Sequence, residues 1–220
     1  MTSNPLSEVE VRVLGALIEK DLSTPEYYPM SLNALVNACN QKSNRSPVVS
    51  YDEETVAQAL ESLRQRKLAL VTTGAEHRVP KHGHRVAETL NMGNRELAVL
   101  CELMLRGPQT PGELKSRTQR LHEFDDLEGV ESSLRHLIEW QPEPLVVQLP
   151  RQPGMREVRY AHLLSGDVEV AAQPEIPVSA MPGRSGMEQR VEKLENEVET
   201  LRATVEELRE RLESLLRQFQ

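Results

Sequence analysis

The chain has 220 residues, of which 38% are hydrophobic but only 3% aromatic, and its formal net charge is −8. So few aromatic side chains favour several small helical cores over one large core. No run of about 18 apolar residues occurs, so we expect no membrane span. The acidic balance argues against a simple DNA-binding protein, because such proteins neutralise phosphates with clustered Lys and Arg.

The amino-terminal segment and the cysteines both indicate a reducing cytoplasm. The opening residues, MTSNPLSEVEVRVL, lack the basic head and apolar block of a secretory signal. Cys39 and Cys101 are isolated, so they suggest neither a disulfide framework nor a thiolate metal site. Both fall on apolar helix faces, and we expect core thiols rather than nucleophiles.

The first part of the chain predicts three helices followed by two strands. Ser7 and Glu10 have the spacing of a capping box, and the apolar stripe behind them contains Val13, Leu14, Leu17 and Ile18. Ser31 is expected to cap a second, short helix, and Asp52 a third helix that runs to about Lys67. The segment LALVTT then predicts a strand, and EHRVPKHGHRV a turn and a return strand.

The same order recurs after residue 90. Asn94 is expected to cap a helix whose stripe contains Leu97, Leu100, Cys101, Met104 and Leu105. Thr110 and Glu113 form the next capping box. A third helix carries Val130, Leu134 and Leu137, which repeat the spacing of Val56, Leu60 and Leu63, and the strands PLVVQL and VRYAHLL follow.

This repetition predicts a mainly α fold with small β-hairpins, namely two tandem winged-helix domains followed by a C-terminal coiled-coil helix. The expected domains span residues 1–90 and 91–165. Residues 166–186 are rich in proline and glycine and are expected to be a flexible linker. Residues 187–220 form the predicted coiled-coil helix.

The coiled coil is predicted from apolar residues that alternate spacings of four and three. Valine at a and leucine at d favour two parallel strands, so we expect a homodimer. A lone amphipathic helix that packs back on its own domains is the alternative. The expected dimerisation residues are Val191, Leu194, Val198, Leu201, Val205, Leu208, Leu212 and Leu215.

Several blocks within residues 1–165 resemble the YceH-like family of uncharacterised bacterial proteins. They are VLGALIEK, YYPMSLNALVNACNQKSNRSP, LRGPQTPGELKSRT, RLHEF and LVVQLPRQPGMREVRYAHLL. The resemblance implies two winged-helix domains and brings no established activity, ligand or catalytic residue. The C-terminal heptads lie outside these blocks.

Basic and polar side chains between the predicted helices and in the hairpins suggest nucleic-acid contacts. Residues 37–47, NACNQKSNRSP, contain the residue types that bind phosphates and adenine edges. Their amides could instead cap the second helix and bond their own backbone, whereas Lys42 and Arg45 are expected at the surface. Solvated hairpin tips are the alternative for the wings. The candidate contacts are Lys42, Arg45, Arg78, Lys81, Arg85, Lys115, Arg117, Arg151 and Arg156.

The predicted third helices argue against insertion into a DNA groove. They begin with acidic residues, Asp52, Glu53 and Glu54 in the first domain and Asp125, Asp126 and Glu128 in the second. We expect a dimeric regulator-like protein that binds nucleic acid through its basic wings. The alternative is a protein-interaction adaptor whose acidic helices dock a basic partner. His82 and His84 are a two-ligand pair with His77 nearby, but no third or fourth ligand has a fixed spacing, so a surface or structural role is expected instead of a metal site. We expect no cofactor, metal or catalytic set.

Overall fold

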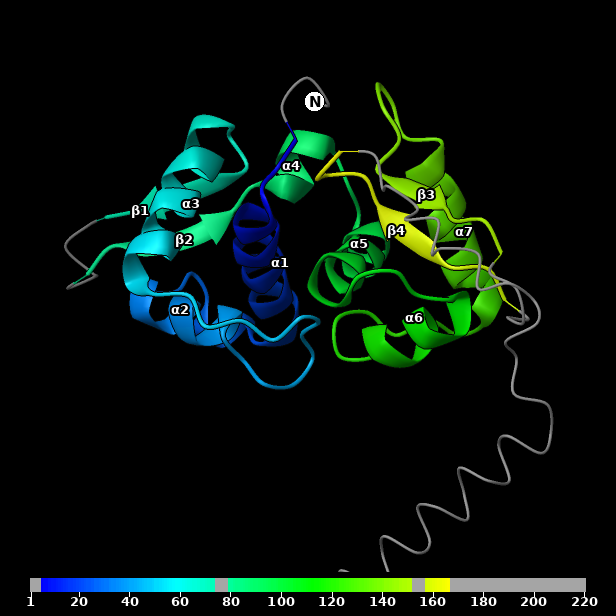
Figure 1. The fold of residues 1–220 in the computed structure, drawn as a ribbon, viewed down its shortest axis with the longest axis horizontal. Helices are drawn as coiled ribbons and strands as arrows, with labels where there is room; N and C mark the ends of the chain where they lie inside the picture. The colour runs from blue at the N-terminus through cyan, green and yellow to red at the C-terminus, as the bar shows by residue number, and fades with distance from the viewer. Residues whose placement is uncertain (1–4, 74–78, 152–156, 167–220) are drawn as a thin grey trace, which may run out of the picture. The chain divides into compact units, whose positions relative to one another are not determined.

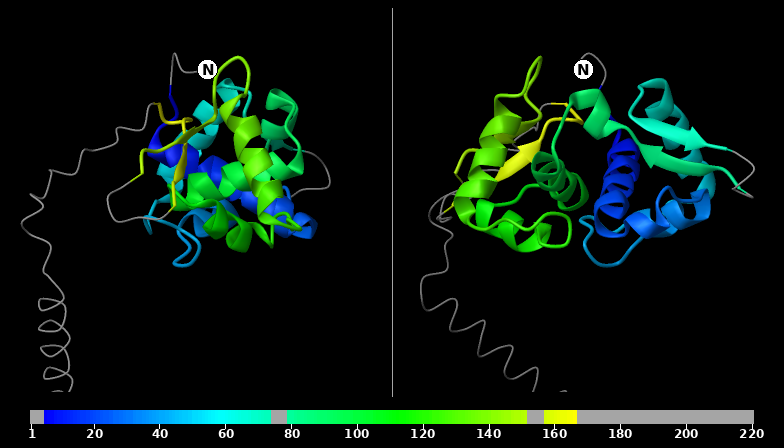
Figure 2. Two further views of the ribbon diagram at one scale, coloured as in Figure 1. Left: turned by 90° about the vertical axis from the view of Figure 1, so that its right-hand side faces the viewer. Right: turned by 180° about the vertical axis from the view of Figure 1, so that it is seen from behind.

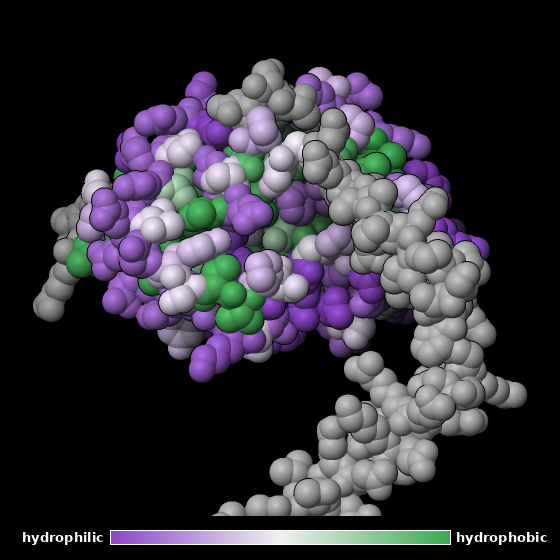
Figure 3. Space-filling view, in the orientation of Figure 1, coloured by the Kyte–Doolittle hydropathy of each residue, from purple (hydrophilic) through white to green (hydrophobic). Residues whose placement is uncertain are grey.

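The computed structural model of the chain describes residues 5–73, 79–151 and 157–166. Within these ranges it contains seven α-helices, one short 3-10 helix and two antiparallel hairpins (Figure 1). All of them belong to one compact unit, residues 1–170. No helix in the described ranges is both long and apolar enough to cross a membrane. Hydrophilic residues cover most of the face shown in Figure 3, with hydrophobic residues scattered among them.

The first repeat comprises three helices and a hairpin. In chain order it contains α1 (Glu8–Ser23), η1 (Pro25–Tyr27), α2 (Leu32–Cys39), α3 (Glu53–Gln65), β1 (Ala69–Thr72) and β2 (Lys81–His84). The Ser7 hydroxyl accepts from the Glu10 N–H while the Glu10 carboxylate accepts from the Ser7 N–H, so the predicted capping box is confirmed. Ser31 and Asp52 cap α2 and α3 as predicted.

The second repeat follows the same order after a connecting helix, α4 (Val86–Leu90). It contains α5 (Asn94–Arg106), α6 (Pro111–Thr118), α7 (Leu127–Ile138), β3 (Val146–Gln148) and β4 (Tyr160–His162). The capping box of Thr110 and Glu113 is confirmed. Each hairpin is antiparallel; Ala69 faces His84 in the first and Val146 faces His162 in the second.

Two local predictions differ from the structure. The N-cap of α5 is Gly93, and Asn94 is already the first helical residue, so the prediction that Asn94 is the cap is wrong. Gly93 has the extended backbone of a cap, with φ −79° and ψ 166°, but no side chain that could mark it in the sequence. The helix α4 was not predicted; it begins at Val86, the last residue of the expected return strand.

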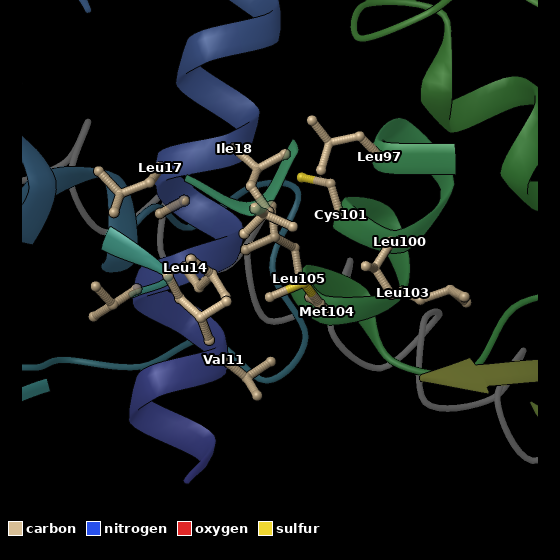
Figure 4. Packing of buried hydrophobic residues seen from close by; sticks show 14 of the residues in the cluster. Val11, Leu14, Leu17, Ile18, Leu97, Leu100, Cys101, Leu103, Met104 and Leu105 are labelled. Atoms are coloured by element: carbon tan, nitrogen blue, oxygen red, sulfur yellow. The ribbon is translucent and has the colours of Figure 1, made fainter. Parts of the chain in front are cut away.

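The helices α1 and α5 pack against each other and join the repeats (Figures 2 and 4). Gly15 lies in this contact, where an added Cβ would be 2.9 Å from the Leu105 side chain. Every residue of α1 from Glu10 to Glu19 is buried, because the helix lies between α5 and the rest of its own repeat. Buried residues of both repeats form one cluster, so the expectation of several separate cores is not met. The predicted boundary at residues 90 and 91 falls between α4 and α5 and stays a prediction.

Candidate functional site

The polar segment, residues 37–47, connects α2 to α3 and bonds back to the protein. The side chain of Asn40 makes two hydrogen bonds of 2.8 Å with Tyr51, donating to its carbonyl and accepting from its N–H. Asn44 has a left-handed backbone, with φ 59°, and its side-chain oxygen accepts from the Arg106 guanidinium on α5. The Asn40 bonds agree with the alternative that the amides bond the backbone, whereas Asn44 bonds a side chain of α5.

Arg45 is buried, so the prediction that it lies at the surface is wrong. Its side chain is 0% exposed, and Nη2 lies 2.6 Å from a carboxylate oxygen of Glu19 on α1. The same guanidinium donates to the carbonyl of Ala38. In the sequence, Arg45 resembles a surface residue because its neighbours are polar. Its ion-pair partner lies 26 residues away, and no local sequence pattern links the two. Arg45 therefore anchors the connector and is removed from the candidate nucleic-acid contacts.

Arg12 is a second anchor, which the sequence analysis did not identify. From α1 it donates to the carbonyl of Cys39 at 3.2 Å and to that of Pro47 at 2.6 Å. Arg12 and Arg45 thus bind carbonyl groups at both ends of the polar segment from the interior. The only sequence signal was an arginine between two valines, Val11 and Val13, at the start of the predicted apolar stripe.

The ionisation of this cluster follows from burial and charge. Burial alone would raise the pKa of Glu19, but the hydrogen bonds and positive charge of Arg45 outweigh burial and hold that pKa below its usual value. Burial lowers the pKa of Arg12, and the neighbouring Arg45 lowers it further. The Glu19 carboxylate therefore stays charged, as an ion pair with Arg45 requires.

In the first hairpin, the candidate cations sit beside a buried histidine. Lys81 is half-buried, and exposed Arg85 forms an ion pair of 2.9 Å with Glu88. His84 is buried; its Nε2 lies 3.0 Å from an Asp21 carboxylate oxygen, and its Nδ1 accepts from the Val86 N–H. His84 thus closes the hairpin onto α1. Arg78 lies outside the described residues.

In the second repeat, two of the candidate cations bond within the repeat. The Arg117 guanidinium donates to the side chain of buried Gln109 at 2.8 Å and lies 3.4 Å from the Glu113 carboxylate. Lys115 donates to the carbonyl of Asp125 at 3.0 Å. Arg151 is exposed, as is Lys42 in the first repeat, while Arg156 lies outside the described residues.

The acidic starts of α3 and α7 are exposed. One acid in each serves as N-cap, since Asp52 accepts from the Thr55 N–H and Asp126 from the Gly129 N–H, both at 2.8 Å. The other four carboxylates, Glu53, Glu54, Asp125 and Glu128, are exposed as well. Negative charge suits a helix N-terminus electrostatically, but it also makes both surfaces repel phosphates.

The cysteines are buried, as predicted. Burial raises the pKa of the Cys39 thiol to about 12 and raises that of Cys101 well above its usual value. Cys101 donates to the carbonyl of Gly15 across the junction between α1 and α5. Neither thiol has the lowered pKa of a nucleophile. Within the described ranges, no three His, Cys, Asp or Glu residues are grouped so as to hold a metal ion.

The predicted dimerisation residues, from Val191 to Leu215, lie outside the described residues, so the coiled coil and the homodimer stay predictions. The predicted linker also lies outside them beyond residue 166.

Comparison with known proteins gives consistent matches over the described unit. Residues 6–155 match the model of the family described as "Protein of unknown function, DUF480". A UPF0502 protein of Opitutus terrae is 60% identical over 172 residues, which cover 78% of this chain and 75% of that protein. A UPF0502 protein of Geotalea daltonii is 53% identical over 191 residues, covering 86% of this chain and 87% of the relative. The chain therefore belongs to the DUF480 family of bacterial proteins, whose curated members carry the name UPF0502, in agreement with the YceH-like resemblance.

Proposed function

We propose that each repeat is a winged helix and that the chain is a non-catalytic adaptor that docks a basic protein partner on α3 and α7. The order of three helices and a hairpin in each repeat supports the winged-helix assignment. In a DNA-binding winged helix, the start of the third helix approaches the phosphates. The observation that carries the adaptor proposal is that both third helices begin with three exposed carboxylates each.

The cations point the same way. Arg45 is buried in an ion pair, Arg117 bonds to Gln109 and Glu113, and Arg85 faces Glu88. These three guanidinium groups could bind phosphate only if they gave up the carboxylate or amide groups that they already contact. An adaptor surface built from the acids needs no such exchange, and charge complementarity would speed its encounter with a basic partner.

Nucleic-acid binding is the second candidate, because Lys42 and Arg151 are exposed on the connector and beside the second hairpin. A duplex could contact these side chains and the remaining hairpin cations through its backbone without insertion of α3 or α7. Such contacts would be weak singly and would add together in a dimer.

One experiment separates the candidates. A photo-crosslinking residue replaces exposed Gln58 on α3 in the native host. Crosslinked partners are then identified for the otherwise unchanged protein and for two charge-reversal variants. The variant Asp52→Lys/Glu53→Lys/Glu54→Lys should lose the partner. The control Glu26→Lys/Glu139→Lys/Glu157→Lys, which changes the charge equally at other exposed sites, should retain it. A partner retained by the first variant contradicts docking at α3.

The same proteins are titrated with random-sequence duplex DNA at low and physiological salt. The adaptor predicts no salt-sensitive binding. Binding that falls steeply with salt and disappears in Arg78→Glu/Lys81→Glu/Arg85→Glu would instead support backbone contact by the first wing.

We further propose that the C-terminal heptads make the protein a parallel homodimer. Leu201→Pro interrupts the predicted seam and should halve the mass measured by light scattering. An unchanged mass would contradict a dimer held by this segment.

A further inference from the structure

A partly enclosed cavity of about 350 Å³ lies between the first helices of the two repeats. Leu14 and Ile18 of α1 line it together with Leu100 and Met104 of α5 (Figure 4). The helix α4, the segment that follows α7 and the segment that follows β4 contribute further walls, as do Leu6, Arg66 and Leu68. Its position differs from the acidic starts of α3 and α7, which do not line it.

The walls are mainly apolar, and two of their backbone N–H groups already have partners. The Leu6 N–H donates to the Leu164 carbonyl, and the Leu163 N–H to the Leu145 carbonyl, both at 2.8 Å. Water in such a site lacks the two to four polar partners that hold it. The surface therefore suits a ligand with few hydrogen-bonding groups.

The charges at the cavity also favour a neutral ligand. Its charged lining residues are Arg66 and Glu143, which have opposite signs. The Arg66 Nε lies 3.4 Å from the Glu10 carboxylate, so this cation is already engaged. A charged group on a ligand would lose its hydration beside two wall charges of opposite sign, so the lining favours neither a carboxylate nor an ammonium group.

We propose that this cavity binds a small, neutral, mainly apolar molecule with two or three linked aromatic rings or an equivalent aliphatic body. The size supports this class, since an engineered cavity of about 150 Å³ holds benzene and pockets for small ligands begin at about 300 Å³. Bound there, the molecule contacts both repeats at once. The proposal does not depend on the function proposed for α3 and α7, whose acidic residues can be changed independently.

Trp140, the single tryptophan of the chain, lines the cavity and provides the test. The full-length protein is titrated with N-phenyl-1-naphthylamine, a neutral probe that absorbs tryptophan emission. The expected result is saturable quenching of Trp140 with matching sensitised probe emission and one probe per chain. The anionic relative 8-anilinonaphthalene-1-sulfonate should bind at least about tenfold more weakly, a difference of about 1.4 kcal/mol.

Two variants that fill the cavity identify the site. Leu90→Phe and Leu164→Phe enlarge half-buried wall residues and should each weaken probe binding at least about tenfold. Leu121→Phe makes the same change at a half-buried leucine outside the lining and should leave the affinity unchanged. Thermal unfolding of each variant shows whether it is folded. Because the two wall positions lie on separate segments, one variant still tests the site if the other does not fold.

Three outcomes overturn the proposal. The first is the absence of saturable energy transfer from Trp140. The second is that both wall variants bind the probe with the same affinity as Leu121→Phe. That result would place the probe at another site, such as the apolar heptad positions. The third is tighter binding of the anionic probe, which contradicts a neutral ligand.

Discussion

At the scale of single residues, the ion pair between Arg45 and Glu19 decides how the polar segment is held. Both side chains are almost fully buried, with 0% and 4% exposure. Removal of one partner from a buried pair leaves an uncompensated charge, whereas replacement of both can be neutral. Composition alone suggested phosphate contacts here, because neither the depth of Arg45 nor its distant partner is encoded in the run of polar residues.

Arg45→Met should lower the free energy of unfolding by about 3–5 kcal/mol, measured by urea denaturation. The double variant Arg45→Met/Glu19→Met should recover much of this loss. Lys42→Met, a matched change at an exposed position of the same connector, should leave the denaturation midpoint unchanged. Equal midpoints for Arg45→Met and Lys42→Met would contradict the buried pair.

A second prediction concerns His162 on β4. Burial lowers the pKa of its imidazole to about 4, below the usual 6.5, and its buried Nδ1 has no hydrogen-bond partner among the described residues. The unfolded chain therefore binds the proton more readily. Stability contributed by the neutral ring is fully present above pH 6.5 and is lost as pH falls toward 4. His162→Phe should flatten the dependence of unfolding free energy on pH in that window, and an unchanged slope would show that His162 does not cause it.

At the scale of elements, capping patterns predicted helix starts well when the side chain itself made the hydrogen bond. Ser7, Ser31, Asp52 and Thr110 all cap as predicted. The pattern failed at α5, where Gly93 supplies only its backbone. It also missed α4, which is five residues long, begins just after β2 and ends at a left-handed asparagine, Asn91. Short elements fixed by their neighbours carry little periodic signal.

The caps give a paired test. Thr110→Ala removes the hydroxyl that accepts from the Glu113 N–H and should cost about 1 kcal/mol of stability. Asn94→Ala lies inside the first turn of α5 and should cost no cap energy. Both are measured by chemical denaturation, and a comparable loss in Asn94→Ala would restore Asn94 as the effective cap.

At the scale of the whole molecule, the packing of α1 against α5 makes the repeats one unit. The repeated order of elements was visible in the sequence because each helix carries its own stripe. The packing of the two repeats into one unit was not visible, because it depends on contact between Gly15 of the first repeat and Leu105 and Met104 of the second. The candidate surfaces divide in the same way: the acidic helix starts could be predicted locally, whereas the cavity between the repeats could not.

Gly15→Val should therefore destabilise both repeats together. Its side chain collides with Leu105, and such overpacking typically costs about 1–3 kcal/mol. Unfolding followed by Trp140 fluorescence, in the second repeat, and by far-ultraviolet circular dichroism should shift to the same lower midpoint. Gly112→Val is the matched control, since an added Cβ there meets nothing closer than 4.0 Å. A Trp140 transition that does not move would show that the repeats unfold separately.

The burial of α1 on all sides also bears on how the chain is made. The hydrogen bond from Cys101 to Gly15 spans 86 residues, so α1 leaves the ribosome long before its partner α5. During that interval, the face of α1 that meets α5 has no native cover. A nascent chain halted near residue 90 would display that apolar face, which is the kind of surface that chaperones bind and that drives aggregation. The first repeat therefore completes its native packing only after α5 of the second repeat has been synthesised.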